Sequence, residues 1–475
     1  MAVTSATAPP AGSPEVVGES DGAEASSGAS SPPKDPLHRR RAGGGSTDRV
    51  DSPLTAIAES LLGSDLPVGI RTYDGGYLGP ADPPAVLEVR SVDALRRLVT
   101  APGELGFARA YVAGDIEITG DIFALLGLRT SLPRPKLSPG AWARALRIVG
   151  PSAFRPLEVP PEELKPAGRL HSLRRDRQSV SHHYDVSNDF YETVLGPAMT
   201  YSCALFTEPD CSLDRAQWSK LELVCSKLAL RPGMRLLDVG CGWGSMVRHA
   251  ARHHGVEALG VTISEEQARW ARQRVADEGL SDLVEIRLAD YRELGGETFD
   301  AISSIGMSEH VGDVDVLEQY YRSLANLLEP GGRLLNHAIS RPPGARAGIG
   351  PRSFVGRYVF PDGALVEVGQ AISAMQSAGL EARHMENLRE HYARTLRAWV
   401  DNLEANWELC VSQAGEARAR IWRLYMAGSA LGFEDARIAV NQVLAVHRGA
   451  GSNFPARPDW SPAPTAPEDP FGRSR

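Results

Sequence analysis

The sequence contains little cysteine and no long apolar run, and each shortage argues against a class of protein. Its 475 residues include five cysteines, an odd number, and no Cys-x-x-Cys pair. A zinc ribbon or a secreted disulfide framework needs paired or closely spaced cysteines, so both are disfavoured and a reducing cytoplasm is expected. No stretch of about 18 apolar residues is present, so we expect no membrane-spanning helix. The first residues also lack the charged-then-apolar pattern of a secretory signal.

An excess of basic side chains is also missing. The chain carries 51 Lys and Arg against 59 Asp and Glu, which gives a formal charge of −8. Proteins that bind nucleic acid usually have the opposite sign, so no nucleic-acid partner is expected. With 42% hydrophobic and 23% charged residues the composition is that of a globular protein, and any membrane contact must be peripheral.

Composition divides the chain into five segments. Residues 1–52 are mostly Ala, Gly, Ser, Pro and Thr, cannot bury enough apolar surface to fold, and are expected to be disordered. We expect a small α+β domain over residues 53–127, a linker over 128–168, the main domain over 169–447 and a loose tail over 448–475.

Inside the small domain, apolar spacing predicts a helix over residues 54–62, a strand over 85–90 and a second helix that begins at Ser91. Residues 104–123 look rich in turns. Nothing in this domain points to catalysis.

Two short basic clusters interrupt the acidic chain, at residues 38–41 and 169–177. The simplest explanation of both basic clusters is that they belong to solvated segments that connect folded parts of the chain. The alternatives are a weak attraction of the first cluster to anionic lipid, and a surface on the second for phospholipid headgroups or an acidic carrier protein.

From Trp218 onward, helices and strands alternate. Apolar runs predict strands over residues 234–239, 256–262, 284–288, 299–304 and 333–339. Alternating βα units of this length form a parallel sheet, so the predicted fold class is α/β with a doubly wound, Rossmann-like sheet. Residues 394–446 are expected to be a mostly helical appended segment.

The strongest local motif follows the first of these strands. Asp238 ends the strand, and Gly240, Gly242 and Gly244 lead into a helix at Ser245. Such glycines let the backbone approach a ligand, and the helix N-terminus favours its negative groups. An acid at the strand end is typical of the loop that holds S-adenosylmethionine (SAM) in class I methyltransferases, and the absence of a Walker lysine argues against a nucleoside triphosphate.

The next two strand ends carry further candidate cofactor contacts. Thr262 stands where a dinucleotide fold usually has an acid, so the ribose contact is unusual or comes from Gln267. Ser264 and Gln267 also match a Ser-x-x-Gln capping box, and both roles are compatible. After the third strand, Asp290 is positioned to accept from the adenine amino group and Tyr291 to stack on the ring.

Residues 181–191 contain two adjacent histidines, His182 and His183, close to Asp185. Neighbouring residues do not share a helix face, so a metal site is disfavoured here and no metal ligands are predicted. No Asn-Pro-Pro-Tyr-like run follows the fourth strand, which argues further against a nucleic-acid substrate.

Together these motifs resemble the cyclopropane-fatty-acyl-phospholipid synthase family, which includes the mycolic acid cyclopropane synthases. The matching stretches cover roughly residues 170–447 and are SHHYDVSNDFY (181–191), MTYSCALF (199–206), LLDVGCGWGS (236–245), GVTISEEQ (260–267), DYR (290–292), SIGMSEHVG (304–312), PGGRLLNHAI (330–339), FVGRYVFPDG (354–363), HYARTLRAW (391–399) and the helical segment from Trp422 to Phe433. Residues 53–127 look like the family's smaller lipid-associated domain.

The resemblance implies that SAM donates a methyl group to a cis alkene of an acyl chain, after which the carbocation loses a proton and closes a three-membered ring. It implies a bicarbonate ion as the base, held by Cys203, Glu309, His337, Tyr392 and the backbone of Ile339. Tyr201 and Ser202 map beside the cofactor. Aromatic faces that stabilise a cation are expected from Tyr201, Phe206, Tyr358 and Phe360.

Each residue of the implied bicarbonate site also has an ordinary structural explanation, such as a small buried thiol at Cys203 or a hydrogen-bonded strand end at His337. Their joint occurrence at the family's motif positions favours a functional set. Departures from the family pattern at Ser308, Asp362 and Leu365 flank the implied acyl tunnel and leave chain length, headgroup and product open.

We therefore predict a SAM-dependent C-methyltransferase that acts on unsaturated acyl chains of phospholipids, with cyclopropanation as the leading outcome. It is expected in the cytoplasm, peripherally associated with the inner face of the cell membrane. Whether it forms a homodimer is left open by the sequence. The alternatives are a methylene or methyl-branched product completed by a separate reductase, a methyltransferase for soluble small molecules, and a lipid- or SAM-binding regulator without turnover.

Overall fold

The computed structural model of the chain describes residues 49–131, 187–345, 350, 353–361 and 363–448, together with scattered residues between 140 and 164 and residues 466, 467 and 470. The basic clusters at 38–41 and 169–177, the histidines of the 181–191 motif and Asp362 lie outside the described residues. No helix in the described part of the chain is long and apolar enough to cross a membrane.

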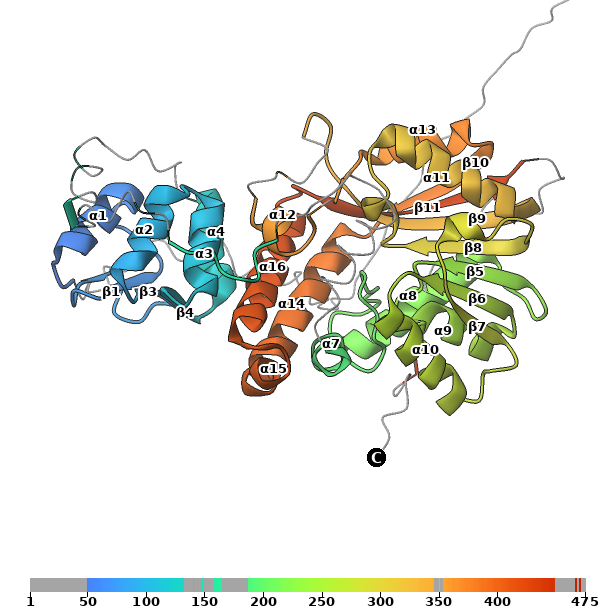
Figure 1. Ribbon diagram of the computed structural model, residues 1–475, viewed down its shortest axis with the longest axis horizontal. Coiled ribbons are helices and arrows are strands. Elements are labelled where there is room, and N and C mark those ends of the chain that lie inside the picture. The colour runs from blue at the N-terminus through green and yellow to red at the C-terminus, as the bar shows by residue number, and fades with distance from the viewer. Residues whose placement is uncertain are drawn as a thin grey trace, which may run out of the picture. The chain divides into compact units, whose positions relative to one another are not determined.

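A seven-stranded sheet forms the larger part of the structure (Figure 1). Its strand order is β10-β11-β9-β8-β5-β6-β7, and β11 alone runs antiparallel to its neighbours. The α/β fold class with a doubly wound sheet is thereby confirmed. The strands are β5 (Arg235–Val239), β6 (Glu257–Thr262), β7 (Val284–Leu288), β8 (Phe299–Ile305), β9 (Leu328–Ser340), β10 (Leu380–Asn387) and β11 (Ala439–His447).

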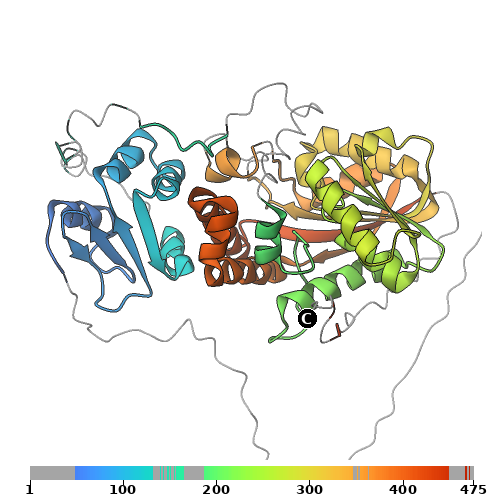
Figure 2. The ribbon, with the colours of Figure 1, turned by 60° about the horizontal axis from the view of Figure 1, so that its bottom comes forward.

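Helices cover both faces of this sheet (Figures 1 and 2). On β5, Leu236 packs with α8 (Leu213–Leu228), α9 (Ser245–His254) and α10 (Glu265–Asp277). Its neighbour Leu237 packs on the other face with α11 (Val314–Leu327) and α13 (Val368–Ser377). Because successive strand residues point to opposite faces and both faces are covered, the central strands are continuously apolar.

The prediction of a mostly helical segment over residues 394–446 is only partly right. Helices α14 (Arg389–Ala405), α15 (Trp407–Ala414) and α16 (Glu416–Glu434) are present, but β11 follows them, and β10 was also not predicted. β11 is a central strand between β9 and β10, with seven consecutive buried residues. A short run that is buried on both faces shows no period-2 alternation, so it cannot be told from a buried helix by pattern.

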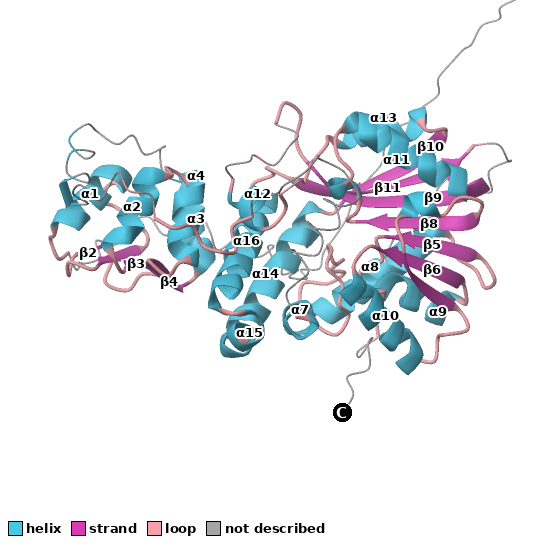
Figure 3. Cartoon of the chain, in the orientation of Figure 1, coloured by secondary structure: helices cyan, strands magenta, loops and turns pink. Residues whose placement is uncertain are grey.

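The N-terminal elements form a separate four-stranded sheet with the order β2-β1-β3-β4 (Figure 3). The predicted helices and strand are confirmed as α1, α2 and β3, but the turn-rich interpretation of residues 104–123 is wrong because α3, β4 and the start of α4 lie there. The buried face of α3 includes small residues such as Gly106, Ala108 and Ala110, which weaken the apolar signal. The elements are α1 (Pro53–Leu62), β1 (Gly69–Thr72), β2 (Tyr77–Leu78), β3 (Ala85–Val89), α2 (Val92–Thr100), α3 (Glu104–Val112), β4 (Ile116–Gly120) and α4 (Ile122–Ser131).

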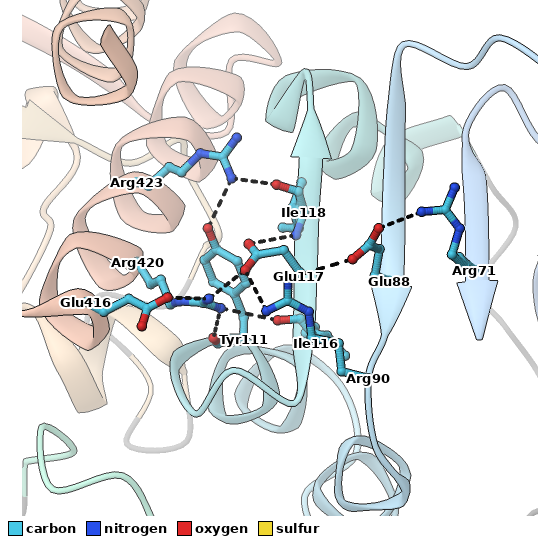
Figure 4. Close-up of polar contacts among 10 residues, drawn as sticks. All are labelled: Arg71, Glu88, Arg90, Tyr111, Ile116, Glu117, Ile118, Glu416, Arg420 and Arg423. Carbon is cyan, nitrogen blue, oxygen red and sulfur yellow. Dashed lines mark hydrogen bonds and ion pairs between the residues drawn. The ribbon is translucent and has the colours of Figure 1, made fainter. Parts of the chain in front are cut away.

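Two arginines of α16 bind the free edge of this sheet at β4 (Figure 4). Arg423 donates to the carbonyls of Ile118 and Gly120 at 3.0 and 3.2 Å, and Arg420 donates to that of Ile116 at 3.3 Å. These carbonyls belong to alternate residues of an edge strand, where a further strand would otherwise pair. The guanidinium groups therefore satisfy the edge and connect the N-terminal sheet to α16.

Candidate active site

A cavity of about 600 Å³ lies at the carboxyl ends of β5, β6 and β8. This is the usual ligand position in an open α/β sheet. One part of its lining comes from the glycine-rich loop after β5 and the loops after β6 and β7. Another part is largely apolar and comes from α12 (Phe354–Tyr358) and the residues just after it, α14 and α16, with Val355, Phe360, Leu396, Tyr425 and Phe433 among its residues.

The glycine-rich loop is folded as the motif predicts. Gly240, Gly242 and Gly244 have φ values of 76°, 53° and 78°, in the left-handed region that favours glycine. A Cβ atom on Gly240 would lie 3.2 Å from Sδ of Met307, and one on Gly244 would lie 3.2 Å from Cβ of Ala271 in α10. Gly240 and Gly242 line the cavity, whereas Gly244 caps α9 and allows close packing of α10.

Asp238, at the end of β5, is buried and lines the cavity. Its Oδ1 accepts a hydrogen bond of 2.6 Å from the hydroxyl of Ser303. Burial raises the pKa of Asp238 to about 6, and the hydrogen bond opposes that shift. The carboxylate is thus held in place, with a nearby positive charge from Lys220.

Thr262, Ser264 and Gln267 form a connected network beside the cavity. The hydroxyl of Ser264 accepts from the backbone N–H of Gln267, which confirms half of the predicted capping box. The other half differs, because Oε1 of Gln267 accepts from the Thr262 hydroxyl at 2.9 Å while Thr262 Oγ1 accepts from the Ser264 N–H. This arrangement fixes two side chains that line the cavity, Thr262 and Gln267.

Asp290 and Tyr291 also line the cavity, after β7. Both carboxylate oxygens of Asp290 accept from the guanidinium of Arg292 at 2.7 Å. The ring of Tyr291 meets Tyr320 edge-on, with centroids 4.9 Å apart. The predicted contacts of these two residues with adenine stay predictions. The Asp290 carboxylate would have to accept hydrogen bonds from Arg292 and from the adenine amino group at the same time.

The side chain of Glu309 points at β9. Its Oε1 accepts from the backbone N–H of Ile339 at 2.7 Å, while its buried Oε2 has no hydrogen-bond partner among the described residues. Burial raises the pKa of Glu309 to about 7. His337 and Ile339 lie two residues apart on β9 and so face the same side of the sheet.

The tautomer of His337 follows from a buried chain of hydrogen bonds. Lys227 can only donate, and its Nζ lies 2.7 Å from Oε1 of Gln442, so the amide nitrogen of Gln442 faces Nδ1 of His337 at 3.2 Å. Nδ1 is then the acceptor, and the neutral ring carries its proton on Nε2. Burial lowers the pKa of His337 to about 3, so the ring stays neutral. This Nε2 is buried and has no partner within the described part of the chain.

Cys203 and Tyr392 meet at one carbonyl group. The thiol sulfur of Cys203 lies 3.2 Å from the Ala204 carbonyl oxygen and 3.6 Å from that of Leu388, and the backbone N–H of Tyr392 donates to the Leu388 oxygen at 3.0 Å. Burial raises the pKa of Cys203 strongly, so it is a thiol and not a thiolate. Glu309, Ile339, Tyr392, Tyr201 and Ser202 line the cavity, whereas Cys203 and His337 are buried but are not among its lining residues.

Two of the four aromatic residues expected to face a cation lie at the cavity, and their role there stays a prediction. Tyr201 and Phe360 line the cavity, but Phe206 packs under Arg394 and Tyr358 hydrogen-bonds Glu163 at 3.3 Å, and neither reaches the cavity. Tyr425, which the sequence reasoning missed, lines it instead. Residues of a helix that is buried on most sides, as α16 is, give no pattern that separates cavity from core.

Lys220 is a second residue that was missed. It is buried on α8, lines the cavity, and donates to the hydroxyl of Ser202 at 3.1 Å. Burial lowers its pKa to about 8. The signal was present in the sequence, since Lys220 falls within the apolar stripe that contains Leu221 and Val224, where a charge is unusual.

A family model described as mycolic acid cyclopropane synthetase matches residues 171–443. The chain belongs to this family. Within it, the chain is 44% identical to a probable fatty acid methyltransferase of Mycobacterium tuberculosis, over 83% of this chain and 95% of that protein. It is 33% identical to the cyclopropane-fatty-acyl-phospholipid synthase of Escherichia coli strain K12, over 76% of this chain and 87% of that protein.

The fold agrees with a solved member of the family. The mycolic acid cyclopropane synthase CmaA1, complexed with SAH and CTAB, matches with a TM-score of 0.53 and 31% identity, over 57% of this chain and 98% of that chain. The protein is therefore a SAM-dependent methyltransferase of the cyclopropane synthase family, as the motifs predicted. Residues 170–475 make up less than two thirds of the chain. The two relatives that match 83% and 76% of this chain must therefore also match part of residues 1–169.

Proposed function

We propose that this protein transfers a methyl group from SAM to a cis double bond in an acyl chain of a phospholipid and closes a cyclopropane ring. The observation that carries the proposal is a pair of buried atoms, Oε2 of Glu309 and Nε2 of His337, that have no hydrogen-bond partner among the described residues; Glu309 lines a cavity that is apolar on one side. The pair offers one hydrogen-bond acceptor and one donor.

That pair fits a bicarbonate ion. Bicarbonate has one O–H group, which Glu309 can accept, and negatively charged oxygens, to which His337 Nε2–H can donate. Leaving such groups unpaired in the interior costs about 1–3 kcal/mol each, so each is expected to bind a polar ligand. Cys203 and Tyr392 would complete the set that holds it, while the Ile339 N–H keeps the Glu309 carboxylate in place.

Bound SAM supplies an electrophilic methyl group, and bicarbonate supplies a base for the proton that leaves the transferred carbon as the ring closes. The protein's residues provide the surroundings for this reaction. Asp238, Gly240 and Gly242 would hold the cofactor at one end, and the Lys220 ammonium offsets the negative charge of the base. The faces of Tyr201, Phe360 and Tyr425 would stabilise positive charge on the acyl chain without a nucleophile that could trap it.

The phospholipid substrate is supported by the extent of the matches. The relative from Escherichia coli, which is named for a phospholipid substrate, matches 76% of this chain, including part of residues 1–169. The mycolic acid cyclopropane synthase CmaA1 matches only 57% of this chain. We therefore infer that residues 53–127 form a lipid-associated domain next to the methyltransferase domain at 169–447. A peripheral position at the inner face of the cell membrane follows from such a substrate.

A second product has a specific observation in its favour, because the relative with 44% identity is named a fatty acid methyltransferase and not a cyclopropane synthase. If a 1,2-hydride shift first moves the cation to the methyl-bearing carbon, loss of a proton from the transferred carbon would leave a methylene-branched chain, which a separate reductase would saturate. The residues that bind SAM and the base would be the same.

The deciding experiment uses the full chain, labelled SAM and vesicles that contain a cis-monounsaturated phospholipid. Mass analysis should show acyl chains that have gained one CH2 and that resist mild hydrogenation. Chains that gain the same mass and readily take up hydrogen would establish the methylene product. If no label enters the acyl chains while a soluble substrate is methylated, the proposal is wrong.

A further inference from the structure

A second cluster of ligand-type side chains lies outside the cavity, between α8 and the last turns of α9. Cys225, His249 and His254 each offer one ligand atom, and these atoms lie within 4.8 Å of one another. Cys225 and His249 are buried, and the His254 side chain is 19% exposed. None of these three residues lines the cavity.

Glu222 adds a fourth ligand atom to the cluster. Its Oε2 lies 3.0 Å from Nε2 of His249 and 3.1 Å from Nε2 of His254. Thiolate sulfur, imidazole nitrogen and carboxylate oxygen are the ligands that Zn²⁺ takes in proteins. With zinc bonds of about 2.0 Å, neighbouring nitrogen and oxygen ligands of a tetrahedron lie roughly 3.3 Å apart, which is close to both separations.

The local structure explains how these residues meet. Glu222 and Cys225 are three residues apart on α8 and share one face of that helix. His249 and His254 come from α9, which packs against α8 (Figure 1). A divalent cation with one thiolate and one carboxylate carries no net charge, so the cluster would bury no uncompensated charge.

We propose that Glu222, Cys225, His249 and His254 form a structural zinc site. Four protein ligands leave no open position for water or substrate, which is the arrangement of a structural site. When the zinc–sulfur bond forms, Cys225 releases its proton to solvent. The metal would clamp the end of α9, whose other end begins at the glycine-rich loop, onto α8, which carries Lys220. This proposal is independent of the acyl substrate.

The test uses the purified full-length protein after treatment with a chelator, titrated with Co²⁺ as a spectroscopic probe. We expect tetrahedral d–d bands and a near-ultraviolet thiolate-to-cobalt band that saturate at one equivalent, and displacement of Co²⁺ by Zn²⁺. Zn²⁺ should also raise the midpoint of thermal unfolding. A wild-type protein that shows neither band at one equivalent would overturn the proposal and leave Glu222 as a hydrogen-bond partner of the two histidines.

Variants identify the ligands. Cys225→Ser should lose the near-ultraviolet band, and His254→Gln should weaken Co²⁺ binding by more than about tenfold. His253→Gln is the matched control, because the His253 ring contacts the His249 ring with centroids 4.6 Å apart but is not one of the four proposed ligands. Bands that persist in both ligand variants, or that disappear equally in the control, would contradict the assignment. Binding of SAH confirms that each variant is folded.

Discussion

The backbone N–H of Ile339 donates to Oε1 of Glu309 at 2.7 Å, while Oε2 of the same carboxylate, buried beside the cavity, has no partner in the described part of the chain. One oxygen thus fixes the orientation of the side chain, and the other is available to a ligand. This division suits a group that must hold a small polar molecule in a fixed position without moving itself.

Glu309→Gln should lower turnover by at least about 100-fold, because a glutamine that keeps the bond from Ile339 presents its NH2 donor, and no acceptor, to the O–H group of the base. SAH affinity should stay within about twofold, since Glu309 does not belong to the glycine-rich loop. Isothermal titration with SAH and an acyl-labelling assay separate the two effects. In the wild type, burial places the pKa of Glu309 at about 7, so turnover should rise as the pH increases through 7. Unchanged turnover in the variant would refute the role.

Lys220→Met should remove the alkaline limb of the pH profile. Burial lowers the pKa of Lys220 to about 8, so the ammonium that offsets a bound anion is lost as the pH rises through that value. We expect wild-type turnover to fall above pH 8, and the variant to be slower by about tenfold or more with no such fall. The measurement is turnover between pH 6 and 9.5 at fixed bicarbonate. A wild-type profile that stays flat to pH 9.5 would contradict the assignment.

Gln442→Glu should change the tautomer of His337. A carboxylate accepts from Lys227 and from His337 together, so the proton would move to Nδ1 and the Nε2–H donor would be lost. Turnover should fall by about 10–100-fold with SAH binding unchanged. Long-range ¹H–¹⁵N correlation spectra of the histidine ring report the tautomer, which a merely structural role would not alter. A wild-type protein with its proton on Nδ1 would show the interpretation to be wrong.

Gly240→Ala should weaken SAM binding by at least about tenfold, which corresponds to 1.4 kcal/mol. The alanine must adopt a φ of 76° and places a Cβ atom 3.2 Å from Met307 at the edge of the cavity. Gly279→Ala is the matched control, since Gly279 has a φ of 67° with no atom within 4 Å of the added Cβ. Both variants should lose similar stability by urea unfolding, and equal SAM affinities in calorimetry would exclude a role for this close approach.

Arg423→Gln should destabilise the protein by about 3 kcal/mol, because it removes a buried charge that binds the edge of β4 and leaves Glu404 without its 2.6 Å partner. Limited proteolysis should then cleave near the N-terminal sheet before the methyltransferase domain. Arg418→Gln on the same helix is the control and should change the free energy of unfolding by less than about 0.5 kcal/mol. Equal stabilities of the two variants would show that the edge contact contributes nothing.

Much of the site could be predicted because its chemistry is local in sequence. The turn from Asp238 to Gly244 needs glycine at three left-handed positions, and a strand before it and a helix after it define its place at the sheet edge. The same holds for Ser264, whose cap on α10 is set within four residues. Turn geometry and helix capping depend on neighbours along the chain, so the sequence alone carried this information.

Tertiary structure alone decided the rest. β11 enters the sheet between β9 and β10 and places Gln442 opposite His337, a residue 105 positions earlier. Likewise, Lys220 meets Ser202 only because α8 packs against the loop before it, and Arg423 reaches β4 across 305 residues. Burial and hydrogen-bond pairing across such separations depend on how whole elements pack. No local pattern encodes that packing, and it sets the tautomer, the pKa values and the apolar lining on which the proposed chemistry depends.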